Sequence, residues 1–190
     1  LYPTLGECFR HAFFQVGSII TTTGYATTDF DLWPEVSKTI LVLLMIIGAC
    51  AGSTGGGLKI SRLLILCKSI PKQLSLVIHP REIKVIKMDG KAIEHQVMRA
   101  TNVYLAIYFF ITLGSTLFVS VDNFDFTTNF TAVVSALNNI GPGLAGVGPT
   151  RNFCAFSVFS KFVLMFDMLA GRLELYPLLI LFMPSLWRRK

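Results

Sequence analysis

Two short polar segments, each centred on a glycine, contain the residues of this chain best suited to chemistry. They read TTTGYA at residues 21–26 and NNIGPG at residues 138–143, and their central glycines, Gly24 and Gly141, are 117 positions apart. Threonine hydroxyls bond readily to backbone, and glycine tolerates the positive φ that points successive carbonyl groups one way. Rings of such carbonyl oxygens can replace the lost hydration shell of a cation. The two segments therefore predict a site for a dehydrated cation.

Each of these segments follows a short helix candidate and precedes a long apolar stretch that glycine interrupts. The helix candidates, residues 6–20 and 127–138, have at most about four turns and are too short to cross a bilayer. A polar turn at membrane depth persists only where protein encloses it or where it lines a watery path. A phenylalanine and a serine recur at matching positions of the two helices, as Phe13 with Phe130 and Ser18 with Ser135. The pattern predicts two pore-forming repeats of a cation transport protein.

The composition is that of a membrane protein. Of 190 residues, 53% are hydrophobic and 15% charged, and the mean hydropathy is +0.61. Three stretches, residues 39–70, 100–121 and 153–187, reach the roughly 20 mostly apolar residues that a membrane-spanning helix needs. The chain begins with Leu1 rather than Met and has no signal-peptide pattern, so we expect a fragment of a longer protein. We predict an all-α, multi-pass membrane protein.

The sequence has no signature of an enzyme or of a metal site. The four cysteines have no CxxC spacing, and the three histidines lie far from any partner pattern, so no zinc or redox site is predicted. Nucleophile, phosphate-loop and dinucleotide motifs are also missing from the sequence. We therefore predict that the chain is not an enzyme and binds no cofactor covalently.

Charge placement predicts the orientation in the membrane. Residues 59–99 contain nine basic and three acidic residues, a net charge of +6 that equals the charge of the whole chain. Cytoplasmic loops carry such an excess of Lys and Arg. A basic segment can also bind nucleic acid or anionic lipid. We favour a cytoplasmic loop beside lipid headgroups, and we expect no nucleic acid partner.

Residues 48–57 and Arg172 interrupt the apolar stretches. Five glycines in the ten residues GACAGSTGGG make a continuous helix doubtful, since each costs about 1 kcal/mol relative to Ala. The alternative is a close helix-packing face of small residues. We favour a broken helix with a flexible loop at membrane depth. Two roles of Arg172 are equally consistent with the sequence: it forms an electrostatic barrier to cations, or it binds carbonyls of the broken helix as a structural residue.

Four motifs together resemble the Trk/Ktr/HKT superfamily of potassium transporters over essentially the whole chain. They are TTTGYATTDFDLWP (21–34), GACAGSTGGGLKISR (48–62), NNIGPGLAGVGP (138–149) and GRLELYP (171–177), and they are most similar to bacterial TrkH-type subunits. The resemblance implies four helix–pore-loop–helix repeats around one pore, of which this chain contains the last two. The third repeat then covers residues 1–70 without its outer helix, residues 71–99 form the basic cytoplasmic loop, and residues 100–190 form the fourth repeat.

The resemblance also implies the roles of individual residues. The potassium filter maps to Thr22, Thr23, Gly24, Asn139, Ile140 and Gly141. The gate beneath it maps to the intramembrane loop glycines and to a pore-facing arginine, namely Gly48, Gly52, Gly55, Gly56, Gly57 and Arg172.

Function and partners follow from the same resemblance. The implied function is potassium uptake across the bacterial cytoplasmic (inner) membrane. The implied partners are membrane lipid, the remaining two repeats of the same protein, a second copy in a homodimer, and a cytosolic nucleotide-binding regulatory ring. Half a pore cannot close a four-sided filter, so we expect the fragment to be inactive alone. The alternative is a secondary transporter of another ion or solute, whose glycine-interrupted helices form a binding site at the midplane.

Overall fold

The computed structural model describes residues 2–50, 52–53, 55–79, 85–88, 90–172 and 180. Its helices are α1 (Leu5–Ile20), α2 (Glu35–Ile47), α3 (Ile60–Ile78), α4 (His95–Val119), α5 (Phe126–Leu137) and α6 (Val158–Arg172). Single 3-10 turns cover Phe30–Leu32, Ser120–Asp122, Ala145–Val147 and Phe153–Ala155. The fold class is confirmed: the chain is built from two helix–pore-loop–helix units.

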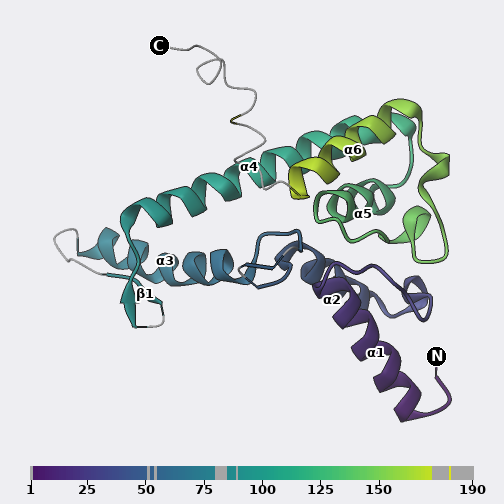
Figure 1. The fold of residues 1–190 in the computed structure, drawn as a ribbon, viewed down its shortest axis with the longest axis horizontal. Coiled ribbons are helices and arrows are strands. Elements are labelled where there is room, and N and C mark those ends of the chain that lie inside the picture. The colour runs from purple at the N-terminus through teal and green to yellow at the C-terminus, as the bar shows by residue number, and fades with distance from the viewer. Residues whose placement is uncertain are drawn as a thin grey trace.

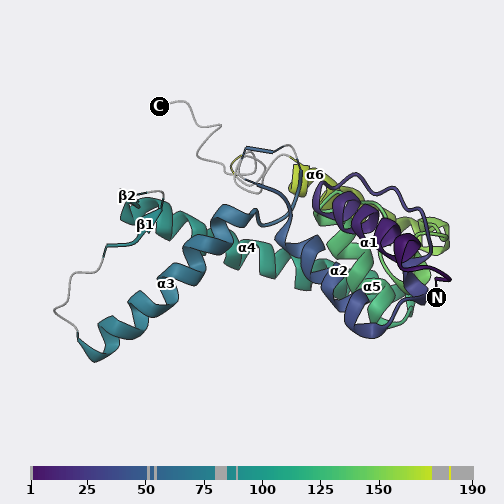
Figure 2. The same cartoon turned by 90° about the horizontal axis from the view of Figure 1, so that it is seen from below.

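The helices form a body and an arm. In Figures 1 and 2, α1, α2, α5 and α6 gather around one end of α4, whereas α3 runs beside the other end of α4 and away from the body. At the end of the arm, β1 (Lys87–Met88) pairs antiparallel with β2 (Lys91–Ala92), an addition that the sequence did not indicate. The body therefore contains both glycine-centred segments, and the arm contains the basic loop.

The two short helices predicted before the glycine segments are confirmed. They end at corresponding residues, Ile20 in α1 and Leu137 in α5, which are 117 positions apart. The Thr4 hydroxyl accepts the Glu7 N–H at the start of α1, and the Asp125 carboxylate accepts the Thr128 N–H at the start of α5. Such caps satisfy donors that the first helical turn leaves free. Both helices therefore begin with a side-chain cap and end at equivalent residues, directly before the glycine-centred loop.

The predicted break in the first long apolar stretch is also confirmed. Helix α2 ends at Ile47 and α3 begins at Ile60, so a continuous packing helix of small residues is wrong. Backbone bonds hold the two ends of the loop together, from the Leu58 N–H to the Ile46 carbonyl and from the Ile60 N–H to the Ala49 carbonyl. The glycine-rich segment is therefore a closed loop with fixed ends.

Helix α4 crosses the length of the molecule. With the turn that follows it, His95–Asp122 spans 28 residues at mean hydropathy 1.8 and, among the described residues, is the helix long and apolar enough to cross a membrane. It contains the predicted stretch 100–121. Of the stretch 153–187, helix α6 covers the part up to Arg172, and the part beyond it, with Glu174, lies outside the described residues except for Ile180.

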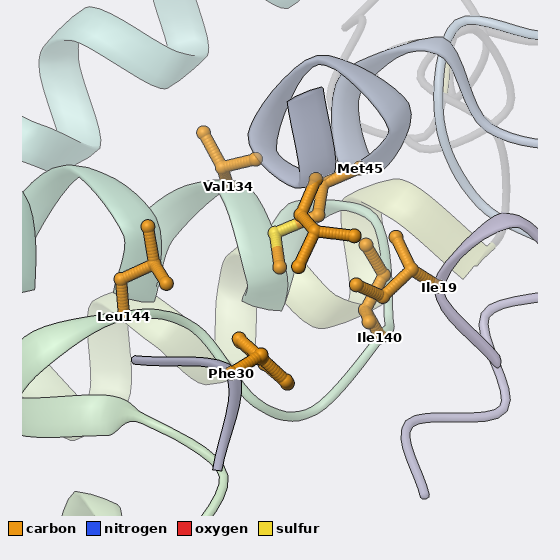
Figure 3. Close-up of a cluster of buried hydrophobic side chains, with 7 residues drawn as sticks. Ile19, Phe30, Met45, Val134, Ile140 and Leu144 are labelled. Atoms are coloured by element: carbon orange, nitrogen blue, oxygen red, sulfur yellow. The ribbon is translucent and has the colours of Figure 1, made fainter. Parts of the chain in front are cut away.

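A buried apolar cluster joins the two units. Figure 3 shows Ile19, Phe30 and Met45 of the first unit against Val134, Ile140 and Leu144 of the second, each at most 5% exposed. Burying a side chain of this size contributes about 1.5–3 kcal/mol. The cluster lies directly behind the two glycine-centred segments and fixes their relative position.

Candidate ion-binding site

The two glycine-centred segments share one pattern of backbone hydrogen bonds. The Thr22 N–H donates to the Ile19 carbonyl at 3.1 Å, and the Thr23 N–H donates to the Ser18 carbonyl at 2.9 Å. In the second unit the equivalent bonds run from Asn139 to Ala136 and from Ile140 to Ser135, both at 3.0 Å. Every donor and acceptor is shifted by the same 117 positions. The last turn of the preceding helix therefore shapes both loops in the same way.

Both loops also contain left-handed backbone at the same two positions. Gly24 and Gly141 have φ values of 78° and 112°, as the sequence predicts for glycine. Two residues earlier, Thr22 and Asn139 each have φ of 55°, which the sequence analysis did not anticipate. For a β-branched residue such as threonine this conformation is an outlier that costs about 1–3 kcal/mol. The surrounding hydrogen bonds hold both loops in this strained form.

The result is a set of carbonyl oxygens free to bind a ligand. All six N–H groups of these residues donate to the preceding helix, the last pair being Gly24 to the Ser18 carbonyl and Gly141 to the Ser135 hydroxyl. By contrast, within the described part of the chain no hydrogen bond reaches the carbonyl oxygen of any of the six, namely Thr22, Thr23, Gly24, Asn139, Ile140 and Gly141. Because the N–H groups already donate to the helices and the carbonyl oxygens are free to accept, these residues can bind a cation rather than an anion.

The electrostatics of the preceding helices favour the same sign of ligand. Both α1 and α5 end at the loops, so their carboxyl ends face the site. A helix carboxyl end behaves like about half a negative charge. Neither helix has a basic residue in its last turn to cancel that charge.

The two loops lie against each other. A methyl group added to Gly24 would overlap the carbonyl oxygen of Ile140 and lie 3.2 Å from Pro142 Cδ. The Ile140 side chain is buried behind the loop (Figure 3), so Ile140 offers its backbone to the site. At Gly141 the same added methyl would meet nothing within 4 Å among the described residues. One side of the site is therefore closed by the other loop.

Five of the six residues also line a shared cavity of about 730 Å³. Gly24 is the exception, and the remaining lining comes largely from apolar side chains of α6 such as Leu164 and Met165. The predicted filter residues therefore lie together around one space.

The glycine-rich loop lies directly beneath these residues. A methyl group added to Gly56 would overlap the backbone of Asn138, and one added to Gly55 would lie 3.2 Å from Thr22 Oγ1. At the base of the loop, Gly48 and Gly57 cross in contact, with a methyl on Gly57 only 2.9 Å from the Gly48 Cα. Gly52 has φ of 82°, and a methyl added to it would meet nothing within 4 Å among the described residues. Of the predicted gate glycines, Gly55 and Gly56 thus lie against the two predicted filter segments, whereas Gly48, Gly52 and Gly57 do not.

Arg172 lies at the same depth. Together with Gly55, Gly56 and Gly57 it lines a cavity of about 140 Å³ between the loop and the end of α6. Its neighbour Gly171 passes so close to α5 that an added methyl would overlap the Leu137 carbonyl. The structure therefore brings the predicted arginine to the glycine-rich loop.

Comparison with known proteins assigns this arrangement to a family. The family model described as "TrkH: Cation transport protein" matches residues 2–189. The chain belongs to the TrkH family. The resemblance stated from the sequence motifs is thereby confirmed.

Individual members of the TrkH family give the same result. The Trk system potassium uptake protein TrkH of Escherichia coli K12 is 38% identical over 188 residues, covering 99% of this chain and 38% of that protein. The protein of the same name from Salmonella typhimurium LT2 is 37% identical, with the same coverage. The crystal structure of the potassium transporter TrkH from Vibrio parahaemolyticus matches with a TM-score of 0.86 and 38% identity, covering 98% of this chain and 40% of that one. The chain thus spans about two fifths of their length.

In this TrkH-family chain, side-chain hydrogen bonds that the sequence did not indicate support the second glycine-centred segment. Asn138 is fully buried, and its amide donates to the Tyr108 hydroxyl of α4 at 3.0 Å. The Asn139 amide donates to the Met168 carbonyl of α6 at 3.0 Å. Neither contact has a local sequence signal, because the partners are about thirty residues away.

The matched serines Ser18 and Ser135 have opposite roles in the two units. The Ser18 hydroxyl donates to the Tyr25 carbonyl at 2.7 Å, whereas the Ser135 hydroxyl accepts the Gly141 N–H at 3.1 Å. Both serines are buried. These bonds explain why the serine is repeated: in each unit its hydroxyl ties the end of the glycine-centred segment to the preceding helix.

Proposed function

We propose that this chain carries the last two of four pore repeats in the potassium-translocating subunit of a Trk-type uptake system. The observation that carries the proposal is the set of six carbonyl oxygens left free while all six N–H groups are tied back. Carbonyl rings of this kind replace the water that a potassium ion loses on entering a filter. Relatives of this chain are Trk system potassium uptake proteins, which supports potassium as the ion.

In this proposal the filter is assembled from all four repeats. Residues 22–24 and 139–141 supply two of its four sides, and the remaining two repeats supply the others. Half of such a ring leaves the ion partly hydrated, so the fragment alone is expected to be inactive. The domain boundaries proposed are 1–70 for the third repeat, 71–99 for the basic loop and 100–190 for the fourth repeat.

The charge distribution supports an orientation in the bacterial cytoplasmic membrane. The β1–β2 hairpin of the basic loop lies at the opposite end of the molecule from the α1–α2 and α5–α6 connections (Figures 1 and 2). The α1–α2 connection contains Asp29 and Asp31 and no basic residue. Under the positive-inside rule the arm faces the cytoplasm and the filter ends face outward.

The glycine-rich loop and Arg172 are proposed as the gate below the filter. The proximity of Gly55 to Thr22 and of Gly56 to Asn138 supports a position of the loop in the ion path. Arg172, at the same depth, would repel cations, and its five N–H donors would hold carbonyls of the loop. Arg172→Ala is then expected to raise potassium flux, normalised to protein in the membrane, by about tenfold because a barrier of one charge is removed. Normal expression with unchanged or lower flux would contradict the barrier role.

Regulation and assembly belong to the same proposal and rest on the family resemblance. The basic arm is the proposed contact for a cytosolic nucleotide-binding ring, and the complete subunit is proposed to form a homodimer in contact with membrane lipid.

The proposal is tested by complementation. The complete reading frame that contains this chain should restore growth of a potassium-uptake-deficient bacterium on low potassium, and Gly24→Val should abolish the preference for potassium over sodium. Gly17→Ala, in open space on α1, serves as the matched control. Restored growth with unchanged selectivity in Gly24→Val would reject the filter assignment. Failure of potassium uptake, with uptake of another ion or solute, would favour a secondary transporter instead.

A further inference from the structure

A side chain of the third repeat holds the outer part of the fourth-repeat loop. The Asp31 carboxylate accepts the Ala145 N–H through Oδ1 at 3.0 Å, across 114 residues of sequence. Beside it, the Thr150 hydroxyl donates to Asp29 Oδ2 at 3.1 Å. A methyl added to Gly148 would lie 3.7 Å from the Asp31 carboxylate, so little space separates the two loops at this point. These contacts bridge the repeats just beyond the filter segments.

The bond to Ala145 differs in origin from those of its neighbours. The N–H groups of Gly143, Leu144 and Gly146 donate to the Val147 carbonyl, the Thr131 hydroxyl and the Thr128 hydroxyl, all within the fourth repeat. The Ala145 N–H donates to the third repeat. Ala145 also has φ of 53°, a strained conformation that persists only where the surroundings hold it.

Asp31 is well placed to hold this backbone because its own segment is rigid. Its N–H donates to Asp29 Oδ1 at 3.0 Å, which caps the 3-10 turn Phe30–Leu32. Phe30, in the same turn, is fully buried against Ile140 and Leu144 (Figure 3). The carboxylate is therefore fixed by the same core that lies behind the filter.

We propose that Asp31 is a positioning residue for ion selection, and this inference rests on the proposed function. Ala145 follows Gly141 by four residues, so its backbone bond to Asp31 sets the separation of the two filter segments at their outer ends. A filter discriminates between ions of different radius only while its carbonyl oxygens keep a set spacing. Loss of the bond would let the fourth-repeat loop relax away from the third and weaken the discrimination.

Two substitutions separate this role from simple attraction of cations by a negative charge. Asp31→Asn keeps an acceptor oxygen for Ala145 and removes the charge, whereas Asp31→Ala removes both. In the full-length protein, Asp31→Ala should lower the potassium-to-sodium selectivity ratio by about tenfold, the loss expected for one hydrogen bond to a charged acceptor. Asp31→Asn should retain most of the selectivity. Glu35→Gln, which removes an exposed carboxylate paired with Lys38 in the first turn of α2, is the matched control and should leave the ratio unchanged.

The outcomes distinguish this inference from the proposed function. Equal loss of flux in Asp31→Asn and Asp31→Ala, with selectivity intact and the loss disappearing at high ionic strength, would overturn the positioning role in favour of electrostatic attraction. Wild-type selectivity in Asp31→Ala at normal membrane levels would overturn it outright. Failure of the unaltered reading frame to transport potassium would instead reject the proposed function itself.

Discussion

The two pore helices have the same local structure and very different surroundings. Helix α5 packs against α2, α4 and α6, and nine of its twelve residues are buried. Helix α1 packs against α2, and much of its apolar surface is exposed, including Phe13 at 73%. The matching residue of α5, Phe130, is partly buried in the cluster that joins the two repeats. Yet both helices end at equivalent residues and lead into loops with the same hydrogen bonds and φ values.

The comparison indicates that local sequence shapes the two glycine-centred loops. The helix carboxyl end, a buried serine and a glycine are present in both repeats, and they give the same loop although, within this chain, α5 packs against more helices than α1. The surroundings instead determine how the two loops are held relative to each other. Substitutions at matched positions can therefore separate the local contribution from that of the neighbours.

The largest effect is expected at the central glycines. Gly24→Ala would place a methyl group on the Ile140 carbonyl, and we expect the potassium-to-sodium ratio of the full-length protein to fall about 100-fold, from this overlap and from the cost of positive φ. Gly141→Ala should lose as much, because a four-sided filter places a carbonyl of another repeat at the equivalent position. Radiotracer uptake in proteoliposomes measures both. If Gly24→Ala lowers the potassium-to-sodium ratio and Gly141→Ala does not, no carbonyl of another repeat lies against Gly141, and the four-sided filter is contradicted.

The next effect concerns the loop beneath the filter. Gly56→Ala would force the loop away from the Asn138 backbone, so potassium flux should rise by about tenfold as the blocked path opens. Gly114→Ala, within helix α4, adds a methyl that meets nothing within 4 Å among the described residues and keeps a helical φ, so it should leave flux near wild type. Deleting several residues from the loop should raise flux further and weaken regulation. Reduced flux in Gly56→Ala at normal expression would count against a gate in this position.

A smaller effect should distinguish the two matched serines. Ser135→Ala leaves the Gly141 N–H without its acceptor, which costs about 1–3 kcal/mol and disturbs the filter itself. Ser18→Ala leaves the Tyr25 carbonyl without its donor, one residue beyond the filter. We therefore expect Ser135→Ala to raise the KM for potassium more than Ser18→Ala does, in uptake assays on the full-length protein. A larger increase in the KM for potassium from Ser18→Ala than from Ser135→Ala would contradict this prediction.

The smallest effect is expected at the helix caps. Hydrogen bonds from the Thr128 hydroxyl and N–H lower the pKa of Asp125 below its usual 3.8, so the folded state favours the ionised carboxylate. Its stabilising effect is therefore complete above pH 3.8 and is lost as the pH falls below that value towards the lower folded pKa. Asp125→Ala should destabilise the protein by about 1 kcal/mol at neutral pH. The difference in melting temperature from wild type should shrink below pH 3.8.

The cap of the other pore helix provides the control for that measurement. The Thr4 hydroxyl does not titrate, so the effect of Thr4→Ala on the melting temperature should be the same at neutral pH and below pH 3.8. A deficit in Asp125→Ala that persists unchanged at acidic pH would mean that its cap does not depend on the carboxylate charge.

The sequence predicted the features that depend on local pattern. The positive φ of Gly24 and Gly141 was predicted because these glycines repeat in equivalent settings, and the helix break was predicted because five glycines within ten residues oppose a helix. The left-handed conformation of Thr22 was missed because residue type argues against it, and only the bonds of its neighbours to α1 impose it. The β1–β2 hairpin was missed because its strands have two residues each.

Contacts between distant segments were beyond the reach of the sequence. The bond between Asp31 and Ala145 spans 114 residues, and that between Tyr108 and Asn138 joins two helices whose packing depends on the whole fold. Neither the type of these residues nor the sequence around them indicates the distant partner. Such contacts become visible only when the elements are placed in space, and here they determine how the two locally encoded loops are held.

The most direct test of the central claim is to locate the ion. Crystals of the full-length protein grown in rubidium, which has nearly the radius of potassium, would show the ion by anomalous scattering. The account predicts rubidium peaks between the backbone carbonyls of residues 22–24 and 139–141, on the outer side of the glycine-rich loop. Peaks that lie away from both segments, or that are held by side chains in their place, would contradict it.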